Sequence, residues 1–254
     1  MVFTDALATI PSLFLKGQLL ILLIGLAPGL FWLWFFYRRD LEPEPIRLVA
    51  AAFLVGAVVS VPVIWLQVSA AAAVRSLYGA VTPEGLHVIE LIVIAPISEE
   101  VLKFLATLVI LRCIKEFDEP MDGIVYGVSV ALGFAAVENV GYLAKAYQAN
   151  LGALTATAII RAVLSVPAHA LFACLWAYAL GYARFSKEGS VTPLYPLLGL
   201  CLAVIAHSLF NLAAIFAPVL GLAIVAVVVL LWEMAEPRIA KLLLRSPHRT
   251  LPDY

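Results

Sequence analysis

Residues 86–111 read LHVIELIVIAPISEEVLKFLATLVIL, an apolar stretch that holds two adjacent glutamates and a lysine. A helix of about 20 apolar residues crosses a bilayer, and this stretch is longer. Glu99 and Glu100 lie near its middle, and Lys103 follows one turn later. Ionisable groups in hydrocarbon cost about 2.5–3.5 kcal/mol each on insertion scales, and chains that keep them there generally use them for chemistry or transport. The stretch therefore predicts a membrane helix with a functional polar face.

The composition of the 254-residue chain predicts an all-α polytopic membrane protein. Its mean hydropathy is +1.04, and 64% of its residues are hydrophobic while 13% are charged. Soluble domains average about 25% charged residues. The net charge of -1 gives no indication of nucleic-acid binding. The three cysteines have no CxxC spacing, which argues against a disulfide framework or a zinc knuckle.

Seven apolar stretches are long enough, or nearly so, to be membrane spans. They are about Gln18–Phe36, Leu48–Leu66, Leu86–Leu111, Met121–Tyr142, Ala153–Ala183, Leu194–Phe216 and Val219–Trp232. We expect one transmembrane domain over residues 1–254, with a polar catalytic cavity in a core at about 86–217. Residues 1–85 would then be accessory helices and residues 233–254 a cytoplasmic tail. The sequence gives no indication of oligomeric state.

The orientation of the chain follows from the Lys and Arg residues between the spans, because cytoplasmic loops are enriched in them. One set of loops and the tail carry Arg38, Arg39, Arg47, Arg112, Lys115, Arg184, Lys187, Arg238, Lys241, Arg245 and Arg249. The opposite loops carry only Lys16, Arg75 and Lys145. This asymmetry predicts an N-terminus outside and a C-terminus in the cytoplasm.

The fourth predicted span combines polar residues with a stripe of small ones. Its polar residues are Asp122, Tyr126, Glu138 and Asn139. Gly or Ala recurs at every fourth position from 123 to 135, which is typical of a face that packs closely on another helix. Asp122 stands at the start of the span, where an N-cap is its default role. Glu138 is a candidate catalytic neighbour or metal ligand.

The fifth and sixth spans each carry a histidine near mid-depth. Arg161, Ser165 and His169 follow one another at intervals of four and share a helical face, as do His207 and Asn211. A buried histidine in hydrocarbon is a candidate functional group. An amide such as that of Asn211 can stabilise a developing oxyanion.

Prolines lie just before the acidic pair and just before the first histidine. Pro96 and Pro167 each remove a backbone hydrogen bond from their helix. We expect a local distortion at each, which could open a wet crevice beside the acids.

The carboxylates, imidazoles and amide of these four spans suit activation of a water against a carbonyl carbon. Other intramembrane hydrolases are disfavoured by missing motifs. The His-Glu-x-x-His motif is absent, because the histidines read His169-Ala-Leu-Phe and His207-Ser-Leu-Phe. An aspartyl dyad lacks a partner for Asp122, and the nearest match to Gly-x-Ser-x-Gly fails at Ala131.

An ordered set of motifs in residues 90–215 resembles the PrsW family of intramembrane proteases, which is grouped with the CAAX prenyl endopeptidases and bacteriocin-processing proteins. The motifs are Glu99-Glu100-Val-Leu-Lys103-Phe104, Asp122-Gly-Ile-Val-Tyr126-Gly127, Gly133-Phe134-Ala-Ala-Val-Glu138-Asn139, His169 and His207-Ser-Leu-Phe-Asn211. The resemblance implies a peptidase of the bacterial plasma membrane that acts on membrane-anchored substrates in the bilayer, such as anti-sigma factors.

Two positions separate this chain from the prenyl endopeptidases. Those enzymes carry an arginine four residues after their second glutamate, whereas Lys103 stands at three, which is the PrsW pattern. They also carry a histidine where this chain has Glu138, which argues against prenylated-peptide specificity. The resemblance leaves two mechanisms open. Glu138, His169 and His207 are candidate ligands for Zn²⁺, but we favour metal-free glutamate catalysis without a cofactor.

In the expected mechanism, Glu99 or Glu100 deprotonates a water held with His169 or His207. Asn211 and a histidine then stabilise the oxyanion, and Glu138 lies beside the reacting groups. The supporting residues are Lys103, Asn139, Tyr126, Asp122 and Arg161. A proton- or ion-coupled transporter is the alternative, because buried Glu, His and Lys also form proton relays. A catalytically inactive scaffold is a third possibility.

Overall fold

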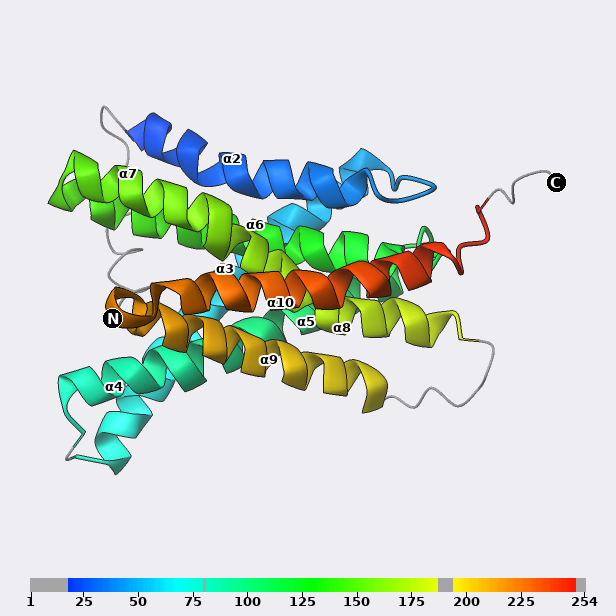
Figure 1. The fold of residues 1–254 in the computed structure, drawn as a ribbon. Coiled ribbons are helices and arrows are strands. Elements are labelled where there is room, and N and C mark those ends of the chain that lie inside the picture. The colour runs from blue at the N-terminus through cyan, green and yellow to red at the C-terminus, as the bar shows by residue number, and fades with distance from the viewer. Residues whose placement is uncertain (1–17, 80, 187–193, 250–254) are drawn as a thin grey trace.

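The computed structural model describes residues 18–79, 81–186 and 194–249, and within these ranges the regular structure is entirely helical. The helices form one elongated bundle in which most run along a common direction (Figure 1). In chain order they are α2 (Gln18–Tyr37), α3 (Ile46–Leu77), α4 (Pro83–Ile89), the π-helical turn η2 (Glu90–Ile94), α5 (Ala95–Cys113), α6 (Asp122–Ala149), α7 (Leu151–Ile160), the π-helical turn η3 (Arg161–Ser165), α8 (Val166–Arg184), α9 (Leu194–Ile215) and α10 (Ala217–Leu243).

Helix α6 is the centre of the bundle, and nearly all of its side chains are buried. It packs against α2, α3 and α8. The predicted small-residue face is confirmed where it meets α8: Gly123 lies against Gly181, and Gly127 lies against Ala177. On another side of α6, a Cβ at Gly133 would lie 1.8 Å from the backbone oxygen of Phe53 in α3. Small residues therefore let two neighbouring helices, α8 and α3, approach the central helix closely.

Gly133→Ala is expected to destabilise the bundle by at least about 2 kcal/mol, because the new methyl group would overlap a backbone atom that cannot rotate away. Thermal unfolding of the purified protein in detergent measures the effect. Gly79→Ala is the matched control, since nothing lies within 4 Å of a Cβ at Gly79. Equal midpoints for the two variants would contradict the close approach of α3 and α6.

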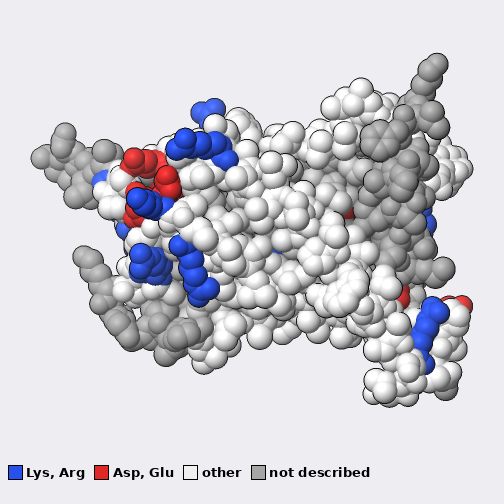
Figure 2. Space-filling model, turned by 180° about the vertical axis from the view of Figure 1, so that it is seen from behind, with Lys and Arg blue, Asp and Glu red and all other residues white. Residues whose placement is uncertain are grey.

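Among the described residues, five helices or continuous helical runs are long and apolar enough to cross a membrane. They are Gln18–Tyr37, Ile46–Leu77, Asp122–Ala149, Leu151–Arg184 and Leu194–Ile215. The run from α4 through α5 is also continuous, but it carries the acidic pair and Lys103. Figure 2 shows a face whose middle is nearly free of charged side chains, with Lys and Arg gathered mainly near one end. This charge distribution is that of a bilayer-spanning protein.

Three details differ from expectation. Helix α3 continues past Leu66 to Leu77, because residues 70–73 are alanines, the best helix formers. Helix α10 continues past Trp232 to Leu243, because Ala235, Ile239 and Leu242 keep one face buried against the bundle. The assignment of Asp122 as an N-cap was wrong.

Met121 occupies the N-cap position of α6, and Asp122 is the first helical residue. The Oδ2 atom of Asp122 accepts hydrogen bonds from the backbone N–H groups of Asp118 (2.9 Å) and Glu119 (2.8 Å). Asp122 thus orders the loop before the helix, rather than the first turn of the helix.

Candidate active site

Two π-helical turns shape the helices that carry the polar residues. Turn η2 ends immediately before α5, and η3 ends immediately before α8. In each case a proline, Pro96 or Pro167, is the second residue of the α-helix that follows. Proline lacks an N–H and its ring clashes with the carbonyl four residues earlier, so a wider turn relieves the conflict. The distortion predicted at each proline is confirmed, and it lies within about one turn of Glu99 and His169.

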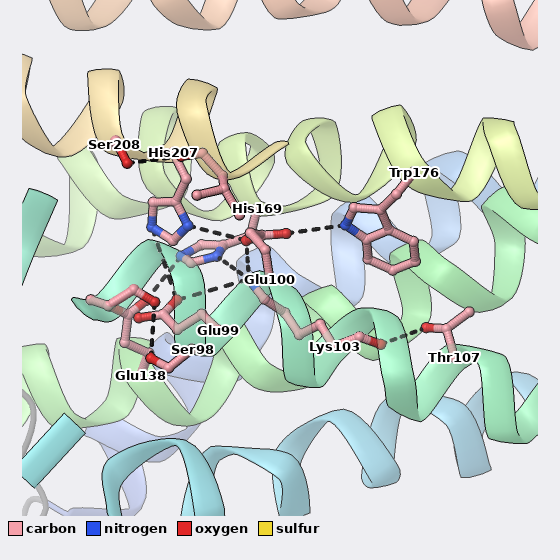
Figure 3. A network of polar contacts seen from close by, with 12 residues as sticks. Ser98, Glu99, Glu100, Lys103, Thr107, Glu138, His169, Trp176, His207 and Ser208 are labelled. Carbon is pink, nitrogen blue, oxygen red and sulfur yellow. Dashed lines mark hydrogen bonds and ion pairs between the residues drawn. The ribbon is translucent and has the colours of Figure 1, made fainter. Parts of the chain in front are cut away.

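Glu100 is a fully buried carboxylate with partners on both oxygens (Figure 3). Its Oε1 lies 2.5 Å from Lys103 Nζ and 3.1 Å from His207 Nδ1. Its Oε2 accepts a 3.2 Å hydrogen bond from Trp176 Nε1. Three donors from α5, α8 and α9 therefore hold Glu100 in place as a structural anion, as expected of a buried charge that is paired and hydrogen-bonded.

Glu99 lies beside Glu100 but has a different environment. Its Oε1 accepts a 3.4 Å hydrogen bond from Gln67 Nε2. Its Oε2 is buried and has no hydrogen-bond partner among the described residues. The nearest cationic or basic nitrogens are Lys103 Nζ at 3.8 Å and His207 Nε2 at 3.9 Å. Glu99 is thus the member of the pair with an acceptor left for another molecule.

His169 is held by a second group of charges. Its Nε2 lies 2.9 Å from Glu138 Oε2, and the same oxygen accepts a 2.8 Å bond from Arg161 Nη2. Arg161 Nε in turn donates to Asn139 Oδ1 at 2.7 Å. On the other edge of the ring, Nδ1 of His169 lies 3.4 Å from Lys103 Nζ. Glu138, Arg161 and Asn139 therefore fix the orientation of the imidazole through its Nε2 atom.

His207 lies against His169 at a ring-centroid distance of 5.3 Å. Phe172 stacks on the His207 ring, 4.7 Å away and nearly parallel. The Nδ1 atom faces the anionic Glu100, which favours a proton on that nitrogen. The Nε2 lone pair is then left facing Glu99, as in metal and water sites where a carboxylate fixes the histidine tautomer.

These groups line a cavity of about 540 Å³. Glu99, Glu138, His169 and His207 contribute to its wall, together with Gln67, Ser165, Arg161 and Asn211. Apolar residues from η2, α7 and α9 complete it, among them Leu91, Ile160 and Phe210. The cavity is large enough for several residues of an extended peptide.

The structure places most of the candidate residues here but separates some. Asn211 lines the cavity, and its Nδ2 donates to the backbone oxygen of Leu91 in η2 at 2.9 Å. Asp122 and Tyr126 lie elsewhere: Tyr126 donates to Glu44 at 2.7 Å, and Asp122 belongs to a separate acidic cluster. These two residues contact neither Glu99 nor the histidines.

The candidate metal ligands also differ from the predicted set. One ligand atom each from Glu99, His169 and His207 lies within 4.8 Å of the others, and all three residues are buried. Glu138 is not in this group, because its Oε2 is already paired with Arg161 and His169. The sequence suggested Glu138, His169 and His207 as candidate ligands, whereas the structure groups Glu99 with the two histidines.

Sequence reasoning missed two residues that contact the acidic pair. Gln67 was excluded because the second span was taken to end one residue earlier. Trp176 follows His169 by seven residues and so lies on the same face of α8, a helical spacing that could have identified it. Both donate to a carboxylate of the pair.

The family model and the curated relatives that match this chain all indicate the same family. The family model of the PrsW family intramembrane metalloproteases matches residues 44–234. The Protease PrsW of Geobacillus kaustophilus is 37% identical over 165 residues, which are 65% of this chain and 67% of that protein. The Protease PrsW of Oceanobacillus iheyensis is 30% identical over 227 residues, which are 88% of this chain and 96% of that protein. No solved structure gives a significant match.

The matched range contains the whole cluster, from the acidic pair on α5 to His207 on α9. The apolar helices, the charge distribution and the bacterial relatives make the chain an integral membrane protein. The chain belongs to the PrsW family and is an intramembrane protease.

Proposed function

We propose that this protease hydrolyses peptide bonds of membrane-anchored proteins with a water held between Glu99 and His207. The observation that carries the proposal is Glu99 Oε2, which has no hydrogen-bond partner among the described residues and lies 3.9 Å from His207 Nε2 in the lining of the cavity. That distance is too long for a direct hydrogen bond and suits a bridging water. A water that donates to both atoms directs its oxygen lone pair toward a carbonyl in the cavity.

The two glutamates then have different roles. Glu99 accepts the proton of the attacking water, as a general base within reach of the reacting atom. Glu100 remains ionised, because Lys103, His207 and Trp176 all donate to it. Its task is to fix the tautomer of His207 and so keep Nε2 as an acceptor.

Asn211 lines the cavity and is the proposed group that faces the carbonyl oxygen, beside His169, whose two ring nitrogens face Glu138 and Lys103. Glu138 and Arg161 hold the His169 ring through Nε2, and the Leu91 carbonyl holds the Asn211 amide. A second amide hydrogen of Asn211 remains available to an oxyanion. Asn139 and Lys103 position these groups without contact with the substrate.

Zn²⁺ is the alternative centre that the family description suggests. The donor set fits: Glu99, His169 and His207 are ordinary zinc ligands, and Glu99 Oε2 is a buried acceptor without a protein partner among the described residues. Since Nε2 of His169 faces Glu138, Nδ1 is the nitrogen that would bind. A bound zinc ion would supply Lewis acidity and lower the pKa of a bound water.

We propose membrane-anchored regulators, such as anti-sigma factors, as the substrates. The cavity combines the polar groups with apolar residues such as Leu91, Ile160 and Phe210, which suits an unwound transmembrane segment. We further propose seven crossings with an outside N-terminus, supported by the positive-inside asymmetry of the loops. The kinship with the CAAX prenyl endopeptidases rests on the ordered motifs alone. A transporter is not favoured.

Reconstitution tests the proposed activity directly. The purified protein in liposomes should cleave a membrane-anchored test substrate into two fragments, and mass spectrometry should place the cut within or next to its transmembrane segment. The same liposomes should show no proton flux above that of protein-free vesicles. Flux without cleavage over a panel of single-span substrates would favour the transporter.

Chelation separates the two mechanisms. Under metal-free glutamate catalysis, dialysis against 1,10-phenanthroline leaves the cleavage rate unchanged, and elemental analysis finds no stoichiometric zinc or other transition metal. With a zinc centre, chelation removes nearly all activity and Zn²⁺ alone restores it. We expect the first result. His207→Ala prepared in parallel shows whether any metal that is found resides at this site.

A further inference from the structure

A second group of buried acids lies away from the active site. Asp40 comes from the α2–α3 loop, Glu119 from the α5–α6 loop and Asp122 from the first position of α6. One carboxylate oxygen from each lies within 4.8 Å of the other two. Sixteen residues of α6 separate Asp122 from Glu138, a distance of roughly 24 Å along the helix. The group is therefore distinct from the catalytic cavity.

In the described part of the chain, most oxygens in this group have no hydrogen-bond donor other than an acid of the same group. Glu119 is 0% exposed and Asp40 is 7% exposed. Both carboxylate oxygens of each, and Oδ1 of Asp122, are buried without a hydrogen-bond partner among the described residues. The other oxygen of Asp122 is held by two backbone N–H groups. Five buried acceptor atoms thus point into one small volume, although buried polar atoms are nearly always satisfied.

The local charge is also unbalanced. The ionisable groups that act most strongly on Asp40 are Glu119, Asp122 and Glu44, and all three are acids. Within the described ranges no Lys or Arg forms an ion pair with Asp40, Glu119 or Asp122. Arg39, the neighbour of Asp40, is paired with Glu236 instead. A cluster of this kind lacks its counter-charge.

We propose that Asp40, Glu119 and Asp122 bind a hard divalent cation, Ca²⁺ or Mg²⁺. The donors are all oxygens, which these ions prefer, whereas zinc and copper favour nitrogen and sulfur. Two oxygens bound to one Ca²⁺ ion lie at most about 4.6–5.2 Å apart, given bonds of 2.3–2.6 Å. The three oxygens here all lie within 4.8 Å of one another, which is close enough for one ion. The number of available oxygens favours Ca²⁺, because Mg²⁺ usually keeps several waters and takes one or two carboxylates.

The bound ion would join two connections of the fold. It would fasten the α2–α3 loop, and with it α2 and α3, to the loop that leads from α5, which carries Glu99, into α6. Figure 2 shows acidic side chains beside the basic ones at the end where the α2–α3 loop lies in Figure 1. Glu44 and Tyr126 close one side of the site through their 2.7 Å hydrogen bond.

Thermal unfolding of the full chain in detergent tests the site. After EDTA treatment and removal of the chelator, Ca²⁺ or Mg²⁺ at about 100 times its Kd is expected to raise the midpoint by roughly 5–10 °C. Glu119→Gln and Asp40→Asn should lower cation affinity at least about tenfold and abolish most of this shift. Each should also unfold at the same or a higher temperature than the wild type without cation, because one repelling charge has gone.

Glu42→Gln is the matched control, since it removes one charge from the same loop as Asp40 but its side chain is 62% exposed. It should keep the full response. Equilibrium dialysis with radioactive Ca²⁺ on the wild type and on His207→Ala counts bound ions and excludes the catalytic site. Absence of both bound cation and midpoint shift at millimolar Ca²⁺ and Mg²⁺ would overturn the proposal and leave protons shared between the acids. An equal response in Glu119→Gln, or loss of bound Ca²⁺ in His207→Ala, would overturn it as well.

Discussion

Glu99→Gln is expected to lower the rate of substrate cleavage by at least about 10³-fold while the protein remains folded. The amide is isosteric with the carboxylate but cannot accept a proton, and general-base contributions of 10²–10⁴ are typical. The Gln67 hydrogen bond to position 99 can be kept through the amide oxygen. Stability should change little, because Glu99 Oε2 has no hydrogen-bond partner among the described residues to lose.

Single-turnover cleavage in liposomes is the appropriate measurement, since it separates chemistry from binding. Substrate affinity should change by much less than the rate. Glu84→Gln is a suitable control, because it makes the same change at an exposed acid on the same helical run. Cleavage by Glu99→Gln at the wild-type rate would exclude Glu99 as the base and leave Glu100 or His207 for that role.

Much of the candidate site was predictable because burying its ionisable residues in hydrocarbon costs free energy. Glu99, His169 and His207 lie in apolar stretches, where an ionisable side chain indicates a functional site. Counting residues from the span ends placed them near one depth, and the structure brings them into the lining of one cavity. Helical geometry also predicted that the adjacent glutamates would point in different directions, since neighbouring residues diverge by about 100°.

The different environments of the two glutamates were not predictable. They depend on what lies across from each carboxylate, and those partners come from other helices: Trp176 in α8 and His207 in α9 for Glu100, and Gln67 in α3 for Glu99. Spacing along one helix cannot give the rotation of its neighbours. The same limit explains why Glu138 was proposed as a ligand, because its pairing with Arg161 depends on the packing of α6 against η3.

The separate acidic cluster shows a further limit of prediction from the sequence alone. Asp122 and Tyr126 were grouped with the catalytic residues because they belong to the same span and to the same family resemblance. They begin the helix, however, and Glu138 lies more than four turns later. Asp40 and Glu119 stand in loops, whose path the hydrophobic pattern does not determine. Only the folded chain brings these acids together.

Lys103→Met is expected to destabilise the protein by about 3–5 kcal/mol, the largest effect on stability that we anticipate. The side chain of Lys103 is 0% exposed, and its ammonium group lies 2.5 Å from Glu100. Methionine fills a similar volume but leaves a buried carboxylate without its cation. An uncompensated buried charge is the main reason why removing one partner of a buried ion pair is destabilising. Activity should fall as well, because Lys103 also contacts His169.

The double variant Glu100→Gln/Lys103→Met distinguishes a lost charge partner from lost packing. If the cost of Lys103→Met is the uncompensated charge on Glu100, removing that charge should restore most of the stability, since buried ion pairs can often be replaced by neutral groups. Cleavage should not recover, because a neutral residue 100 no longer holds the proton on Nδ1 of His207. Chemical or thermal unfolding of the wild type, Glu100→Gln, Lys103→Met and the double variant in one detergent gives the coupling energy between the two residues. A double variant as unstable as Lys103→Met would show that the aliphatic stem of Lys103, and not its charge, stabilises this part of the bundle.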